Sequence, residues 1–114
     1  MKKFNTKDLS IRDIYHLMIS SIAPRPIAFV GSIDKKNNCN LAPFSFFNAF
    51  GANPPIIGFS PTLSGRTGLP KDTLLNIKET HEFTISIVTK DILEQVSLSS
   101  SEYDQDIDEF KKSG

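Results

Sequence analysis

The fold is decided by residues 27–47, which read IAFVGSIDKKNNCNLAPFSFF. Residues 27–33 are a short run that is apolar on both faces, which is typical of a buried strand. The polar turn 34–38 follows, and residues 39–47 form a second extended run, so the stretch predicts an antiparallel hairpin. Pro43 lies inside the second run and has no N–H to donate, which indicates an edge strand or a bulge at that point.

One helix is expected before this hairpin and another after it. Residues 8–19 place apolar side chains at roughly helical spacing, with Ser10 as a possible N-cap. This helix must end before Pro24, because proline lacks the N–H that a helix needs. Downstream, Asp72 can cap a helix over residues 73–80.

Two further strands bring the expected number to four. Residues 56–60 form a third strand after a turn at 53–55, and residues 82–88 alternate between apolar and polar side chains. The side chains expected to point inward from the last strand are Phe83, Ile85 and Ile87. Residues 103–112 are spaced for a short helix. Four strands cannot close a barrel, and open strand edges favour pairing with other chains.

The composition is that of one globular domain spanning residues 1–114. Hydrophobic residues make up 39% and charged residues 23%, and 13 basic side chains balance 13 acidic ones. No net field therefore favours nucleic acid or an anionic membrane. Cys39 is the only cysteine, which excludes an intrachain disulfide and a zinc cluster. With no signal peptide and no run near the ~20 apolar residues that cross a bilayer, we expect a cytoplasmic protein without membrane or nucleic-acid partners.

The loop and helix start over residues 64–73 are rich in groups that bind anions. Unpaired N–H groups and the positive end of the helix dipole favour a negative charge at such a helix start. The side chains that gather there are Ser64, Arg66, Thr67, Lys71 and Thr73. Arginine binds phosphate through two parallel hydrogen bonds, and lysine adds a point charge. The alternative is a solvated loop followed by an ordinary capped helix.

Residues 42–51 combine aromatic bulk with polar groups. Ser45 and Asn48 lie among four phenylalanines, and Gly51 allows a close approach of the backbone. A flat heteroaromatic ring with an amide-like edge needs this combination, whereas plain core packing is the alternative. Arg25, between two prolines, is either a satisfied surface arginine or a second cation aimed at a phosphate.

No pattern in the sequence predicts a catalytic or metal-binding residue. His16 and His81 lack the Ser, Cys or carboxylate neighbours of a triad. Cys39 has no nearby His or CxxC partner, so a small residue near a strand start is favoured over a redox thiol. The acidic run 104–109 lacks the glycine and the distal glutamate of a calcium loop.

Six short segments carry a resemblance to a known family. They are residues 24–30, 40–48, 53–55, 71–77, 82–88 and 108–114, which read PRPIAFV, NLAPFSFFN, NPP, KDTLLNI, EFTISIV and DEFKKSG. In this order they resemble the flavin reductase-like, FMN-binding split-barrel family, most closely its flavoredoxin-type branch. The resemblance runs from about residue 14 to the end.

This resemblance implies a mainly β fold with short helices, a Greek-key split barrel, and a homodimer with FMN at or near the subunit interface. Family members run nearly twice this length, so it also implies an incomplete barrel, truncated at the C-terminus. The residues implied to hold FMN are Ser45, Phe46, Phe47, Asn48 and Ala49 for the ring, Phe59 and Ser60 for the ribityl chain, and Arg66, Lys71 and Thr73 for the phosphate, assisted by Arg25.

The implied function is that of an oxidoreductase in which the flavin does the redox chemistry and the protein binds and orients it. NAD(P)H or a small redox protein would reduce FMN, and the electrons would pass to an acceptor. No GxGxxG motif for a dinucleotide occurs, so the donor stays open. The alternatives are a non-catalytic FMN-binding or electron-carrier module and a truncated domain without cofactor.

Overall fold

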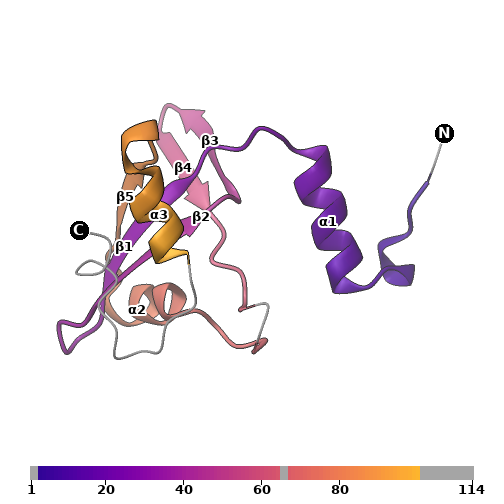
Figure 1. Ribbon diagram of the computed structural model, residues 1–114. Helices are drawn as coiled ribbons and strands as arrows, with labels where there is room; N and C mark the ends of the chain where they lie inside the picture. The colour runs from indigo at the N-terminus through magenta and orange to yellow at the C-terminus, as the bar shows by residue number, and fades with distance from the viewer. Residues whose placement is uncertain (1–2, 65–66, 101–114) are drawn as a thin grey trace.

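The computed structural model describes residues 3–64 and 67–100 and shows a mainly β body with short helices (Figure 1). The strands are β1 (Ala28–Ile33), β2 (Cys39–Phe44), β3 (Phe47–Ala52), β4 (Pro55–Phe59) and β5 (Thr84–Ile87). The helices are α1 (Ile11–Ser21), α2 (Asp72–Thr80) and α3 (Leu93–Ser99), with 3-10 turns at Thr6–Asp8 and Lys90–Ile92. The helix predicted over 103–112 lies outside the described residues.

β1 is the centre of an antiparallel three-stranded sheet with the order β2-β1-β5. The β1–β2 hairpin pairs Ile33 with Cys39 and continues until Ala28 lies opposite Phe44, which confirms the predicted hairpin. Pro43 takes part in this register on β2, the edge strand of the sheet. An edge position is confirmed for the proline, since its missing N–H costs no ladder hydrogen bond on the open side.

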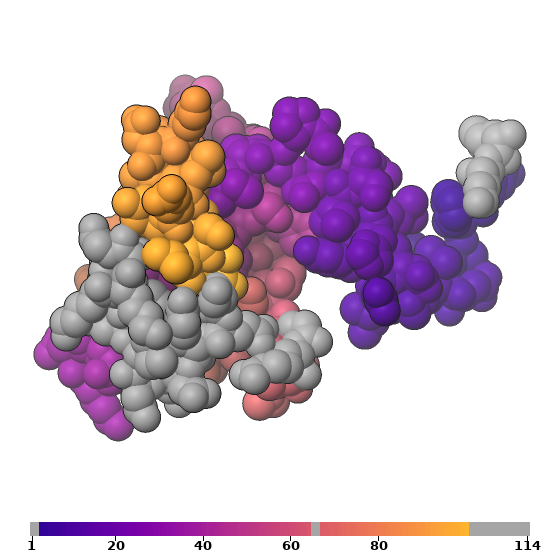
Figure 2. Space-filling model, in the orientation of Figure 1, coloured from indigo at the N-terminus to yellow at the C-terminus, as the bar shows by residue number. Residues whose placement is uncertain are grey.

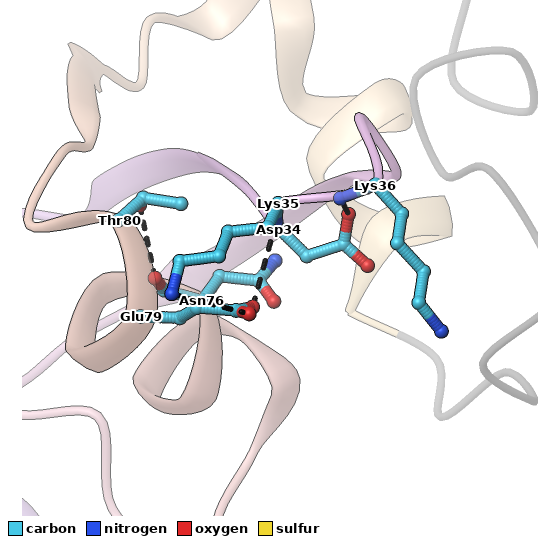
Figure 3. Close-up of polar contacts among 6 residues, drawn as sticks. All are labelled: Asp34, Lys35, Lys36, Asn76, Glu79 and Thr80. Carbon is cyan, nitrogen blue, oxygen red and sulfur yellow. Dashed lines mark hydrogen bonds and ion pairs between the residues drawn. The ribbon is translucent and has the colours of Figure 1, made fainter.

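The turn of this hairpin is closed by Asp34, whose Oδ1 accepts the N–H groups of Lys36 and Asn38, each at 2.8 Å. The same turn meets the end of α2 (Figure 3), where Glu79 accepts the N–H of Lys35 at 3.4 Å and lies 3.9 Å from its ammonium. An exposed pair at this distance adds little stability. The turn therefore depends mainly on its own carboxylate.

The second extended run divides into two strands at residues 45–46, which gives five strands instead of the expected four. β1 begins only at Ala28, because Pro24 and Pro26 before it cannot donate ladder hydrogen bonds. β2 consequently has no partner beyond Phe44, and the chain bends away. The prediction of one continuous run over 39–47 is wrong for this reason.

β3 and β4 form a separate two-stranded sheet, with a register shift between Ala49 and Gly51. The two residues at the hairpin turn, Asn53 and Pro54, lie between the paired Ala52 and Pro55, which confirms the predicted turn. Within the described residues, neither sheet closes on itself or on the other. The described body is thus an open, incomplete barrel.

α2 begins one residue earlier than the sequence predicts. Lys71 is the N-cap, with extended backbone at φ −72° and ψ 154°, and Asp72 already lies in the first turn. The prediction that Asp72 caps the helix is wrong, because its backbone has become helical. A carboxylate in the first turn still interacts favourably with the helix dipole.

The face of α2 that meets the sheet is polar. Thr73 and Asn76 are buried at 1% and 9% exposure. The Asn40 amide donates to the Thr73 hydroxyl at 2.8 Å, and the Asn76 amide donates to the Ser32 hydroxyl at 3.2 Å. Leu74 and Ile77, which the helical spacing suggested for the inner face, are only half-buried. Two buried hydrogen bonds therefore set how α2 docks.

The predicted inward face of β5 is only partly buried. Ile85 is half-buried against the core, which is formed by Ala28, Val30 and Phe44. Phe83 is 47% exposed and Ile87 is 60% exposed. The prediction is wrong for Ile87, because β5 is an edge strand and no described residue covers that part of it.

α1 lies beside the body as a separate lobe, joined to β1 by an extended segment (Figures 1 and 2). Ser10 is its N-cap, as predicted: its hydroxyl accepts the N–H of Asp13 at 3.1 Å and donates to the Asp13 carboxylate at 2.6 Å. In the described part of the chain, no helix combines the length and the apolar character needed to cross a membrane.

Candidate functional site

A groove of about 750 Å³ lies between α1 and the bend that joins β2 to β3. Seven of the predicted cofactor residues line it: Arg25, Ser45, Phe46, Phe47, Asn48, Phe59 and Ser60. They come from three parts of the chain, and the fold brings them together. The predictions placed the phenylalanine-rich bend and the end of the next strand in one site, and both do line this one groove.

The floor of the groove is held by the β3–β4 pairing. Phe47 lies opposite Phe59 in the register, and the N–H of Ser60 donates to the carbonyl of Phe46 at 2.9 Å. Asn48 lies opposite Gly58. These pairings orient the bend, so the aromatic rings and the polar side chains of Ser60 and Asn48 share one surface.

Gly58 leaves room for a neighbouring ring. A Cβ built there would lie 3.0 Å from Cε2 of Phe50, closer than almost any real contact. Phe50 itself lines the groove and is 70% exposed. With a side chain at position 58 this ring would have to shift, so the glycine helps to keep it in the apolar lining.

The opposite wall is the apolar stripe of α1, which the sequence reading did not assign to the site. Its members are Ile11, Ile14, Tyr15, Met18 and Ile22. The Tyr15 ring meets Phe46 edge to face, with 6.0 Å between centroids. The helical spacing predicted from Leu9, Ile14, Leu17 and Met18 includes two of these residues, Ile14 and Met18, but nothing in the sequence says which surface they cover.

Arg25 lies in the groove lining and contacts the end of α1. Its Nη1 donates to the carbonyls of Ile19 at 2.7 Å and Ile22 at 2.5 Å. These carbonyls belong to the last turn and the C-cap of the helix, where backbone acceptors lack helical partners. A cation at this position also interacts favourably with the negative end of the helix dipole.

Lys71 reaches the same aromatic cluster without lining the groove. Its Nζ lies 5.5 Å from the centroid of the Phe44 ring, which is 5.2 Å from that of Phe59. Phe59 also packs edge to face on Phe83 at 5.4 Å. Lys71 is therefore connected to the groove through two rings.

Three other predicted residues are placed differently. Ala49 and Thr73 do not line the groove, and Arg66 lies outside the described residues. The Thr73 hydroxyl is buried and accepts a hydrogen bond from Asn40, so a phosphate could reach it only if that contact opened. The roles of Arg66 and Thr73 at the phosphate and of Ala49 at the ring stay predictions.

The loop that precedes α2 uses many of its own donors. The N–H groups of Thr67 and Gly68 donate to the hydroxyl and the carbonyl of Ser64, at 3.3 Å and 2.8 Å. The N–H of Leu69 donates to the Thr67 hydroxyl at 3.3 Å. The backbone donors of residues 67–69 are thus used within the loop, whereas the N–H groups that the sequence suggested for an anion belong to the start of α2.

A second hollow, of about 560 Å³, lies at the other end of the central sheet beside Cys39, His81 and Glu82. His81 is the C-cap of α2 in the left-handed region, with φ 60°. Among residues 3–64 and 67–100, no three His, Cys, Asp or Glu side chains are grouped to hold a metal ion.

Comparison with known proteins gives a consistent result. Residues 20–114 match the sequence profile of the flavin reductase like domain. Nitrilotriacetate monooxygenase component B from Bacillus cereus has a similar structure, with a TM-score of 0.88 and 33% identity over 99% of this chain and 55% of that one. A flavin reductase with a split barrel domain from Shewanella frigidimarina gives 0.72 and 29%, over 98% and 55%.

The likeness in fold extends to flavoredoxin of Desulfovibrio vulgaris (Miyazaki F), with a TM-score of 0.65 and 23% identity over 80% of this chain and 46% of that one. The chain spans about half the length of the curated relatives that it matches, between 45% and 57% for the first three. The two sheets are open in this chain, and the neighbouring structures contain a further part that this chain does not match.

Proposed function

This chain belongs to the flavin reductase-like family, and on that basis we propose that it is a flavin-dependent oxidoreductase that holds FMN in the groove between α1 and residues 45–48. The observation that carries the proposal is the convergence of seven predicted cofactor residues on this one groove. They come from segments to which the family resemblance assigns the cofactor.

The groove suits the chemistry of a flavin. Its volume of about 750 Å³ falls within the ~300–1,000 Å³ of small-molecule sites. Rings of Phe46, Phe47 and Phe59 offer apolar surface to an isoalloxazine system, and Ser45 and Asn48 offer hydrogen-bonding groups to its polar edge. Mostly apolar walls with a few polar groups are typical of cofactor sites.

We assign the rest of the cofactor by the same resemblance. Phe59 and Ser60 border the ribityl chain, and the phosphate extends toward Lys71, with Arg66 and Thr73 as further contacts. Lys71 supports this assignment because its ammonium lies on Phe44, next to a ring of the groove. The Asp72 carboxylate in the first turn of α2 repels a phosphate at this position. The attraction between the phosphate and the Lys71 ammonium must therefore exceed that repulsion.

Bound FMN would supply hydride and single-electron chemistry, while the protein binds the ring, orients it and keeps water away. We propose NAD(P)H or a small redox protein as the electron donor, and a partner protein or a diffusible acceptor as the recipient. The Bacillus cereus neighbour is by its name one component of a monooxygenase, which supports a partner protein. A cytoplasmic homodimer completes the proposal.

The test is the visible spectrum of the purified protein, followed by titration with FMN and anaerobic addition of NADH or NADPH. A nicotinamide-dependent oxidoreductase binds FMN, and its yellow absorbance bleaches with NADH or NADPH. An electron-carrier module binds FMN but bleaches only with a redox protein or dithionite. A domain without cofactor takes up no FMN, and this result would contradict the proposal.

A further inference from the structure

We propose that Arg25 is a positioning residue: it holds α1 against the body as a wall of the groove, and so controls affinity for the ring of a flavin and not for its phosphate. This inference rests on the proposed function, because it concerns the same groove. It differs from the sequence-based expectation, in which Arg25 assists the phosphate ligands.

The first step is what the guanidinium contacts. Nη1 donates to two carbonyls at the C-terminal end of α1, those of Ile19 and Ile22. The last turn of α1 contains no basic residue of its own, so Arg25 is the cation that meets this end of the dipole. Its Nε is buried and makes no hydrogen bond among the described residues. The guanidinium is thus used to terminate the helix.

The second step is how loosely α1 is otherwise held. The helix lies outside both sheets (Figure 1) and keeps much apolar surface in solvent, with Ile11 88% and Met18 44% exposed. Tyr15 ties it to the groove floor through Phe46. With few contacts to fix the helix, loss of the Arg25 hydrogen bonds should change its position.

The third step links that position to the ligand. α1 supplies one whole wall of the groove, including Ile14, Tyr15 and Met18. A wall of apolar side chains acts on a ring and cannot distinguish a phosphorylated tail from a free one. A phosphate ligand behaves oppositely, because its removal weakens FMN and leaves lumiflavin, which has no tail, unaffected.

The experiment measures dissociation constants of FMN, riboflavin and lumiflavin for the full chain and its Arg25→Ala variant, with hydrogen exchange of α1 in the absence of ligand. We expect affinity for all three flavins to fall by the same factor, on the order of tenfold, as for loss of hydrogen bonds to a charged donor. We also expect faster exchange of the α1 amides, including the Ile22 N–H that bonds to Met18.

The matched control is Arg12→Ala, which removes an exposed cation from α1 itself and gives the general effect of one charge on FMN binding. If circular dichroism shows that Arg25→Ala does not fold, Arg25→Gln replaces it, since glutamine removes the charge and keeps an N–H donor. The loss of affinity for FMN is again compared with the losses for riboflavin and lumiflavin.

A loss confined to FMN, beyond that of Arg12→Ala, overturns the inference and makes Arg25 a phosphate ligand. Unchanged exchange of α1 in the variant overturns it as well. Failure of the wild-type chain to bind any of the three flavins overturns the proposed function instead. That result is recognised in the wild type alone, before any variant is compared.

Discussion

Lys71 is half-buried with its ammonium over the Phe44 ring, and its charge can be removed by substitution without shortening the side chain much. Lys71→Met keeps an unbranched side chain and removes the ammonium, whose Nζ lies 5.5 Å from the centroid of the Phe44 ring. We expect FMN affinity to fall about tenfold and riboflavin affinity to stay within about twofold, because only FMN carries the phosphate. Fluorescence titration of both ligands measures the difference.

Lys78→Met is the matched control for that experiment, since Lys78 is exposed in the last turn of the same helix. It removes the same charge from α2 at the end where an anion is not expected. Equal losses for FMN and riboflavin in Lys71→Met would contradict the phosphate assignment.

Thr73 illustrates a side chain whose structural role can be measured without any ligand. Its hydroxyl is the acceptor for the buried Asn40 amide. Thr73→Val keeps the shape and leaves that amide unpaired, so we expect the free energy of unfolding to fall by about 1–3 kcal/mol. Urea unfolding followed by circular dichroism gives the value, and Thr73→Ser, which keeps the hydroxyl, should lose less.

A Thr73→Val variant as stable as the wild type would show that the contact with Asn40 contributes nothing. Riboflavin and FMN titrations of Thr73→Val, which lacks the hydroxyl, then address its separate, predicted contact with phosphate, with Thr73→Ser as the control that keeps the hydroxyl. The two questions are independent because the first is answered by the protein alone.

At the scale of elements, the β1–β2 turn should respond to pH through one carboxylate. A hydrogen bond from the Asn38 side chain, helped by the N–H groups of Asn38 and Lys36, holds the pKa of Asp34 below its ordinary value of 3.8. A group whose pKa is depressed by folding stabilises the fold above its ordinary pKa, and this contribution is lost as pH falls through the folded value.

The prediction compares the wild type with Asp34→Asn, which keeps an acceptor oxygen but has no charge to titrate. We expect the wild type to have the higher urea midpoint near neutral pH, and the gap to close below about pH 4. Because Asp34 is not buried, the effect should be small. A gap that is the same at neutral pH and below about pH 3 would exclude the charge as its cause.

The sequence predicts correctly those turns and caps that depend on residues adjacent in the chain. The hairpin turn at 34–38, the Ser10 cap and the chain reversal at 53–55 each depend on a few neighbouring residues, and the structure confirms them. The division at residues 45–46 was not predicted, because it depends on where the partner strand begins. The exposure of Ile87 likewise depends on neighbours in space.

The sequence predicted those parts of the site that lie in short motifs of the family resemblance. The bend at 45–48 and the strand end at Phe59 were assigned to one ligand, and both line the groove. The contribution of α1 could not be foreseen, since an amphipathic stripe says that a helix is covered but not by what. The contact of Arg25 with helix carbonyls is equally a matter of three-dimensional placement.

At the scale of the whole molecule, the β3–β4 hairpin carries exposed apolar side chains, here called the rim, and of these Phe50 lines the groove. Phe50 is 70% exposed on β3, and Ile56 and Ile57 are 48% and 57% exposed on β4. If FMN lies at or near a subunit interface, as the family resemblance implies, a second copy would cover part of this rim. Ligand and partner would then stabilise each other, because each binds better to the form that the other favours.

The linkage is measurable in both directions by sedimentation equilibrium and by flavin titration at several protein concentrations. We expect saturating FMN to lower the dissociation constant of the dimer about tenfold, and FMN affinity to rise with protein concentration by the same factor. Phe50→Ser should weaken both, whereas Leu93→Ser, which removes an equally apolar exposed side chain from α3, should weaken neither. A chain that binds FMN with one affinity at every protein concentration and stays monomeric would refute the interface. It would not contradict FMN binding in the groove, because binding within one copy needs only the walls that α1 and the β3–β4 hairpin already provide.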